Sequence, residues 1–225
     1  MKLSNVLKIS TLGLSLLSTS IFAGTLHQVS NAELPRAVEV VDQNQYPSMP
    51  SYSAAGTTNQ WYLCGHGAFA SAFNILRGTA ADDAAQLEWF HQKLLQKPLY
   101  TESDNLTHYE ASGDELAAIV NTRNDFTAAK TSQIDRDKIK QKLHDALDSS
   151  ATQQVIALTK KQGWGHFVVV HEIYYNPGGV NGGHVKFADP WGGVSSNTMG
   201  YTNFLNGMRD EGTPGRYSFW TIKAK

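Results

Sequence analysis

Apolar residues recur at three- and four-residue steps in four stretches of the chain, which is the spacing of one face of an α-helix. The first stretch runs from Gly65 to Arg77 and stops at Gly78, a residue type that commonly ends helices. The other three predicted helices are Asp82 to Gln96, Leu116 to Asn121 and Asp135 to Leu147. Before the third of these, Ser112 and Glu115 have the spacing of a capping box, which marks a helix start.

The pattern changes in the last third of the chain to short runs rich in Val, Ile, Phe and Tyr, separated by Gly, Pro and Asn. Such runs are typical of strands, and they predict strands at Gln154 to Thr159, His166 to Tyr174, Gly183 to Ala188 and Arg216 to Lys223. The residues Asn176-Pro177-Gly178-Gly179 predict a turn that pairs the second strand with the third. Helices followed by strands predict an α+β fold, in which an N-terminal helical half packs against a C-terminal antiparallel β-sheet.

The first 23 residues have the pattern of a secretory signal peptide. Lys2 and Lys8 are the only charged residues before Gly24, and an apolar stretch from Ile9 ends at the small residue Ala23. That stretch is too short and too rich in Ser and Thr to span a bilayer comfortably, although an uncleaved membrane anchor is the alternative. We therefore expect an exported protein, either periplasmic or secreted to the medium or a host cell.

Residues 24–56 read as an extended N-terminal segment that contains Pro35, Pro47 and Pro50. Its one apolar patch, Ala37 to Val41, is expected to form a strand or a short covering segment. A removable pro-segment is the alternative interpretation of this region. With 225 residues in all, the remaining part, 57–225, has the length of one domain.

Composition and charge narrow the classes of partner. The chain is 41% hydrophobic and 17% charged, which suits a folded globule, and its net charge of −1 gives no electrostatic reason to bind nucleic acid. Cys64 is the only cysteine, which excludes an intramolecular disulfide and any zinc site with two thiolates. In an exported protein such a cysteine is buried and inert, linked to another chain, or a reactive thiol.

Cys64 directly precedes the first predicted helix. Its sulfur is therefore expected at a helix N-terminus, where unpaired N–H groups and the positive end of the helix dipole favour a thiolate over a thiol. A lower thiol pKa would make the sulfur a competent nucleophile near neutral pH. A cysteine buried in the core is the alternative, and Cys64 alone does not decide between the two.

Two further segments supply groups that can work with a thiolate. His166 begins a strongly apolar strand, and a histidine held there can act as ion-pair partner and proton carrier. Asp189 ends the next strand, on the face of Val185 and Phe187, and Pro190 terminates the pairing after it. If the two strands pair, Asp189 approaches the imidazole and can fix its tautomer. Taken singly, a histidine beside a strand is more often a packing or surface residue, and Asp-Pro-Trp-Gly is only a turn signal.

In combination and in this order, these segments resemble the papain-like cysteine peptidases. The resemblance covers roughly 57–193 and is carried by Cys-Gly at a helix start, Gly-His-Phe-Val-Val-Val on a strand and Asp-Pro-Trp-Gly-Gly after the next. The branch most similar is the bacterial one that includes bacteriocin leader-processing peptidases. The resemblance implies Cys64 as nucleophile, His166 as general base and acid, and Asp189 as the residue that orients the imidazole.

The resemblance also implies a glutamine that stabilises the oxyanion, five to seven residues before the cysteine. Here Gln60 precedes Cys64 by four residues and Asn59 precedes it by five. Either side chain can donate a hydrogen bond to an oxyanion beside the Cys64 backbone N–H. We assign this role to Gln60 and keep Asn59 as the alternative.

No other group of residues in the sequence forms a convincing site. His166 and His171 lie five apart on one predicted strand and so are expected to face opposite sides, and there is no His-Glu-x-x-His pattern. We therefore expect no metal, no organic cofactor and no catalytic serine.

The sequence as a whole predicts a secreted, monomeric hydrolase whose partner is a protein or peptide substrate, with no nucleic acid and no stable membrane association. Two alternatives remain open. One is related thiol acyl chemistry, namely glutamine deamidation, transamidation or peptidoglycan amide cleavage. The other is a secreted binding module in which Cys64 is merely buried, because fold alone does not dictate function.

Overall fold

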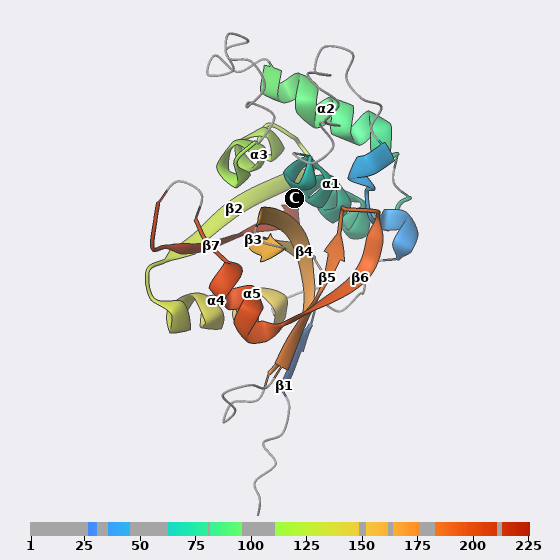
Figure 1. The fold of residues 1–225 in the computed structure, drawn as a ribbon. Coiled ribbons are helices and arrows are strands. Elements are labelled where there is room, and N and C mark those ends of the chain that lie inside the picture. Colours follow the sequence, from blue (N-terminus) through green and yellow to red (C-terminus); the bar gives the residue numbers. More distant parts are fainter. Residues whose placement is uncertain are drawn as a thin grey trace, which may run out of the picture.

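A computed structural model of the chain describes residues 27–30, 36–45, 63–80, 82–95, 111–148, 152–161, 164–175, 183–210 and 213–225. Figure 1 shows the helices α1 (Cys64–Arg77), α2 (Asp83–Leu95), α3 (Gly113–Val120), α4 (Arg136–Asp148) and α5 (Tyr201–Gly207). The strands are β1 (His27–Ser30), β2 (Phe126–Gln133), β3 (Gln153–Lys161), β4 (Trp164–Tyr175), β5 (Gly183–Asp189), β6 (Val194–Gly200) and β7 (Tyr217–Ala224). The expectation of an α+β protein with an antiparallel sheet is confirmed.

The strands form one antiparallel sheet in the order β2-β7-β3-β4-β5-β6, and β1 pairs with the far part of β4. Helices cover both faces (Figure 1). One apolar cluster joins α1, α2 and α3 to the sheet, and a second joins α4 and α5 to it. Along β3, Ile156 and Leu158 belong to the first cluster, whereas Val155 and Ala157 belong to the second. Both faces of the central strands are therefore buried, which explains their nearly continuous apolar sequences.

The four predicted helices and four predicted strands are present, each within a few residues of the expected bounds. Gly78 ends α1 in the left-handed conformation (φ 62°), and its N–H donates to carbonyls of the last turn. Ser112 caps α3, and Glu115 returns a hydrogen bond to the Ser112 backbone, as in the expected capping box. β4 and β5 pair antiparallel, with Tyr175 opposite Gly183. The predicted turn between them lies outside the described residues.

Of the α-helices and strands that the structure describes, four were not predicted, namely β1, β2, β6 and α5. β2 and β6 lie at the two ends of the strand order, so each pairs with only one neighbour and needs little apolar side-chain burial. Residues along β6 alternate between exposed and half-buried, in keeping with its polar sequence. Because β2 lies between α3 and α4, the chain does not run through all its helices before its strands as the sequence suggested. The second helical layer, formed by α4 and α5, also differs from the expected single helical half.

The described parts of the N-terminal segment are built into the fold. β1 pairs with β4, and the apolar patch forms a short 3-10 helix (Ala37–Glu39) followed by the buried residues Val40 and Val41. This segment covers α1 and is not a strand: the Val41 N–H donates to Ser71 Oγ at 2.9 Å. Removal of residues 24–56 would take β1 from the sheet and uncover the part of α1 against which Val40 and Val41 pack.

Candidate active site

Cys64 is the first residue of α1, at the N-terminus where the sequence places it. The helix is buried from Cys64 to Ile75 because it packs against β4, β3 and the neighbouring helices. Leu63 occupies the N-cap position, and its side chain caps none of the N–H groups of the first turn. These N–H groups and the helix dipole favour a negative charge at or beside the Cys64 sulfur.

Glycine at position 65 lets two other elements approach the start of α1 closely. A Cβ added to Gly65 would lie 2.7 Å from Leu116 Cδ1 of α3 and 3.2 Å from Phe167 Cδ2 of β4. Real Cβ atoms do not tolerate the first of these distances, so a larger residue would force the Leu116 side chain to shift. Because Phe167 packs against Gly65, its neighbour His166 lies next to Cys64.

His166 connects Cys64 to Asp189. The His166 Nε2 lies 2.7 Å from Asp189 Oδ1, and the imidazole also interacts with the Cys64 side chain. Since Nε2 is used by Asp189, Nδ1 is the ring nitrogen left for the sulfur. All three side chains are buried: Cys64 is 8% exposed, His166 7% and Asp189 0%. The structure therefore brings together Cys64, His166 and Asp189, which we call the Cys-His-Asp cluster.

The electrostatics of the cluster favour a protonated imidazole. Burial on its own would lower the pKa of His166, but the hydrogen bonds to Asp189 and Cys64 and the negative charges of both groups raise it to about 9. His166 therefore carries a positive charge at neutral pH. An imidazolium between a sulfur and a carboxylate is the arrangement that keeps a thiolate available as a nucleophile.

No protein-family model and no curated protein sequence matches this chain. The function is therefore inferred from the chemistry of the Cys-His-Asp cluster and from the elements that hold it. Among the residues that the structure describes, no helix is long and apolar enough to cross a membrane. In the same residues, no three His, Cys, Asp or Glu side chains lie together in a way that could hold a metal ion.

Groups besides His166 also hold the Asp189 carboxylate. The Trp191 N–H donates to Oδ1 at 2.9 Å, and the Asn197 Nδ2 of β6 donates to Oδ2 at 3.2 Å. These bonds orient the carboxylate toward His166. Sequence reasoning did not find Asn197, because the strand that carries it was not predicted and no motif marks it.

An outer layer from the N-terminal segment fixes the loop after Asp189. The Gln43 N–H donates to the Pro190 carbonyl at 2.9 Å, and the Gly192 N–H donates to Asp42 Oδ1 at 3.1 Å. Gly192 and Gly193 have φ of 82° and 61°, values that glycine adopts without strain. The described segment 36–45 therefore contributes to the position of Asp189, although the two are about 150 residues apart in the chain.

The substitution Gly67→Ala tests how precisely the loop that follows Asp189 must be positioned. A Cβ on Gly67 would lie 2.6 Å from Pro190 Cβ, so Gly67→Ala must displace the loop next to Asp189. Displacements of about 1 Å near a reacting group can cost about 100-fold in rate. We expect kcat/KM for a reaction at the Cys64 sulfur to fall by about tenfold to 100-fold in Gly67→Ala.

Gly200→Ala is the matched control, because a Cβ there meets nothing closer than 3.8 Å. Its kcat/KM is expected to stay within about twofold of the wild type, since surface changes away from packed groups are nearly neutral. Equal activity of Gly67→Ala and wild type would show that the position of Pro190 does not matter for the site.

Several residues that the sequence analysis named are not placed by the structure. Gln60 and Asn59 lie outside the described residues, as does the predicted signal peptide. The oxyanion role of Gln60 or Asn59 and the signal peptide therefore remain predictions. His171 is buried, at an irregularity in the register between β4 and β5, and burial lowers its pKa to about 4. His184 lies against the ring of Tyr174, with the ring centroids 4.5 Å apart. Neither histidine takes part in the Cys-His-Asp cluster.

Proposed function

We propose that this protein is an exported cysteine peptidase of papain-like architecture that hydrolyses peptide bonds. The observation that carries the proposal is the arrangement of Cys64, at the N-terminus of α1, with His166, whose imidazole interacts with Cys64 and whose Nε2 lies 2.7 Å from the buried Asp189. A buried helix that begins with the sulfur and packs against an antiparallel sheet carrying His166 and Asp189 on neighbouring strands supports the papain-like assignment.

In the first half of the proposed reaction, the Cys64 thiolate attacks the carbonyl carbon of the substrate amide. A C–S bond forms, and the carbonyl π electrons move to the oxygen. The backbone N–H groups of the first turn of α1, assisted by Gln60 in this proposal, stabilise the oxyanion. The tetrahedral intermediate then collapses: the C–N bond breaks, and His166 gives its proton to the departing amine. The product is a thioester of Cys64.

In the second half, water replaces the amine. His166, now neutral, accepts a proton from the water as it attacks the thioester carbonyl. The C–S bond breaks, the carboxylic acid product leaves, and Cys64 and His166 return to their charged forms. Asp189 stabilises the imidazolium in both halves and keeps Nε2 protonated, so that Nδ1 carries the transferred proton.

The test of this proposal is cleavage profiling with a proteome-derived peptide library. We expect wild-type protein to generate new peptide termini and Cys64→Ala to generate none. Ser196→Ala, which changes an exposed residue of β6, serves as the control and should cleave like the wild type. The predicted signal peptide further implies that the natural substrates lie outside the cytoplasm.

The same experiment separates peptide hydrolysis from the related chemistries. Glutamine deamidation would change the mass of Gln-containing peptides without new termini, and transamidation would join an added amine to them. Peptidoglycan amide cleavage would require a muropeptide substrate, which can be included as a separate reaction. Library peptides unchanged by the wild type under conditions in which the protein is folded would contradict the peptidase assignment.

A further inference from the structure

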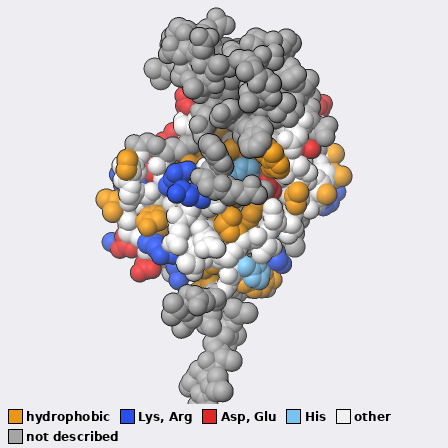
Figure 2. Space-filling model, in the orientation of Figure 1, with side chains coloured by type: hydrophobic (Ala, Val, Ile, Leu, Met, Phe, Trp, Pro, Cys, Tyr) orange, Lys and Arg blue, Asp and Glu red, His pale blue; other side chains and the backbone are white. Residues whose placement is uncertain are grey.

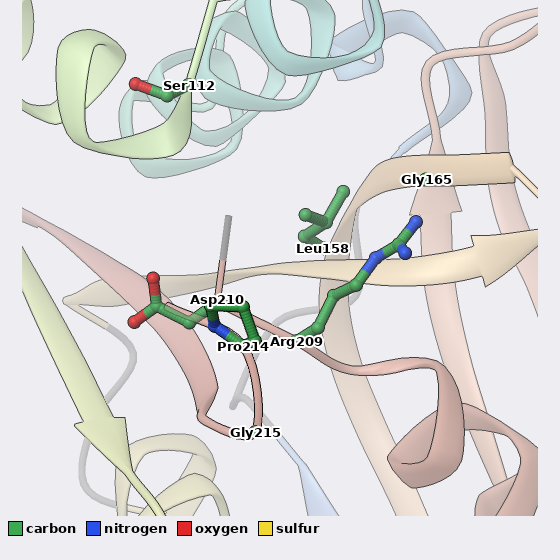
Figure 3. A pocket seen from close by; sticks show the side chains of 7 residues that line it. All are labelled: Ser112, Leu158, Gly165, Arg209, Asp210, Pro214 and Gly215. Carbon is green, nitrogen blue, oxygen red and sulfur yellow. The ribbon is translucent and has the colours of Figure 1, made fainter. Parts of the chain in front are cut away.

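A cavity of about 550 Å³ lies between the start of α3 and the start of β4, and its lining includes Gly165, the residue before His166 of the Cys-His-Asp cluster. Its wall includes Ser112, Leu158, Gly165, Arg209, Asp210 and Pro214. Figure 3 shows the Arg209 side chain reaching toward Gly165 and Leu158, whereas the Asp210 carboxylate points the opposite way. The volume is within the range of sites for small ligands and is sufficient for a substrate side chain.

The lining residues connect this cavity to both reacting groups. Gly165 immediately precedes His166, and Leu158 is paired with Phe167, which packs against Gly65 next to Cys64. Ser112 caps α3, the helix whose Leu116 also packs against Gly65. A peptide whose scissile bond lies at Cys64 would therefore place a nearby residue at this cavity.

The backbone around Arg209 is fixed on both sides. The Ser218 Oγ donates to the Arg209 carbonyl at 3.2 Å, and the Asp210 N–H donates to the Arg216 carbonyl at 2.9 Å. A Cβ on residue 165 would lie 3.2 Å from Arg209 Nη2, so glycine there leaves room for the guanidinium beside His166. Figure 2 shows a small patch of Lys or Arg atoms and pale blue histidine atoms among apolar side chains on the face that it draws.

The charge of Arg209 is not neutralised by the acidic residue next to it. Asp210 accepts hydrogen bonds from Lys130 Nζ at 3.1 Å and from Ser132 Oγ at 3.0 Å, and Lys130 also pairs with Asp114. Within the part of the chain that the structure describes, no carboxylate forms an ion pair with the Arg209 guanidinium. The cavity thus combines one available guanidinium with apolar surface from Leu158 and Pro214.

We propose that Arg209 selects substrates that carry a carboxylate near the scissile bond; this inference rests on the proposed peptidase function. A guanidinium presents a planar pair of N–H donors that matches the two oxygens of a carboxylate. Leu158 and Pro214 contact the aliphatic part of the same residue. The carboxylate comes from an Asp or Glu side chain or from the C-terminus of a short peptide, and both sources share this chemistry.

The experiment uses synthetic peptides built around cleavage sites found in the library. Each of three positions on either side of the scissile bond is occupied in turn by Glu, Gln or Lys, with the peptide C-terminus amidated. We expect the wild type to cleave the Glu peptide with about tenfold higher kcat/KM than the Gln peptide at one position, which corresponds to about 1.4 kcal/mol. In Arg209→Ala this difference should disappear, and in Arg209→Glu the Lys peptide should be preferred.

A second series tests the C-terminal source by comparing free-acid and amidated forms of the same peptides. Preference for the free acid that is lost in Arg209→Ala would show that Arg209 binds the end of the chain. The alkylation rate of Cys64 serves as the control for an intact site and should be the same in the wild type and both variants.

The outcomes separate the two proposals. If the wild type and Arg209→Ala cleave with the same Glu-to-Gln and acid-to-amide ratios, the role of Arg209 is wrong while the peptidase function stands. If the wild type and Cys64→Ala give the same cleavage products, or both give none, the peptidase function is wrong. The inference about Arg209 is then overturned with it.

Discussion

His166→Ala is expected to lower kcat/KM for peptide hydrolysis by about 1000-fold, since general acid–base catalysis contributes about 10²–10⁴. The substitution removes the proton donor for the departing amine and the positive charge beside the Cys64 sulfur. It also leaves Asp189 buried without its main cationic partner, at a position with 0% exposure. The measurement is steady-state kinetics on a peptide from the library, together with circular dichroism to show that the variant is folded.

His144→Ala is the matched control for the loss of a buried histidine. His144 is 6% exposed, against 7% for His166, and its Nε2 lies 2.7 Å from the Tyr201 hydroxyl. It lies in the second apolar layer of the protein, on α4, and makes no contact with the Cys-His-Asp cluster. We expect His144→Ala to lose stability but to keep its kcat/KM within about threefold of the wild type. Equal losses of kcat/KM in His144→Ala and His166→Ala would show that His166 has no chemical role.

Asp189→Asn is expected to shift the basic limb of the pH profile. In the wild type, His166 holds its proton up to a pKa of about 9, so kcat/KM should fall about tenfold per pH unit above that value. Without the carboxylate, burial still lowers the pKa of His166 and only Cys64 opposes it. The limb should therefore move to lower pH by about 1–3 units, the size of a close charge–charge effect. Activity at pH 8.5 should drop more than activity at pH 6.

The same substitution changes the pH dependence of stability. Because the pKa of His166 is raised above its usual 6.5, the pair with Asp189 stabilises the folded protein fully below pH 6.5. This stabilisation is lost as the pH rises through about 9. Urea unfolding at pH 6 and pH 9.5 should therefore show a difference between the two pH values that is smaller in Asp189→Asn than in the wild type.

Asp42→Asn is the control for both measurements. Asp42 accepts the Gly192 N–H but does not contact His166, and an asparagine oxygen can accept the same bond. Its pH profile should keep the wild-type basic limb. A limb that stays near pH 9 in Asp189→Asn would show that the carboxylate does not control the protonation of His166.

The central elements of this fold are readable from the sequence because local signals and burial agree there. α1 has a helical apolar pattern that ends at Gly78, and β4 and β5 are apolar runs joined by a Gly- and Pro-rich stretch. Cys64 at the helix start and His166 and Asp189 on neighbouring strands follow from these elements, so the cluster could be predicted before the structure was known.

The supporting residues could not be predicted in the same way. β2 and β6 lie at the edges of the sheet, where pairing through the backbone leaves little trace in the side-chain pattern. Asn197 depends on β6, and the bond between Asp42 and Gly192 joins residues 150 positions apart. Arg209 lies between α5, which was not predicted, and β7, where no motif marks it. Contacts of this kind depend on the folded arrangement and not on spacing along the chain.

The most direct test of the proposed function is the rate at which Cys64 is alkylated by iodoacetamide as a function of pH. Because Cys64 is the only cysteine, the intact mass of the protein reports its modification alone. An imidazolium next to the sulfur predicts rapid alkylation at pH 6 that slows by at least about tenfold in His166→Ala. Alkylation that is slow at pH 6, rises as for an ordinary thiol near pH 8.5 and is unaffected by His166→Ala would contradict the proposal.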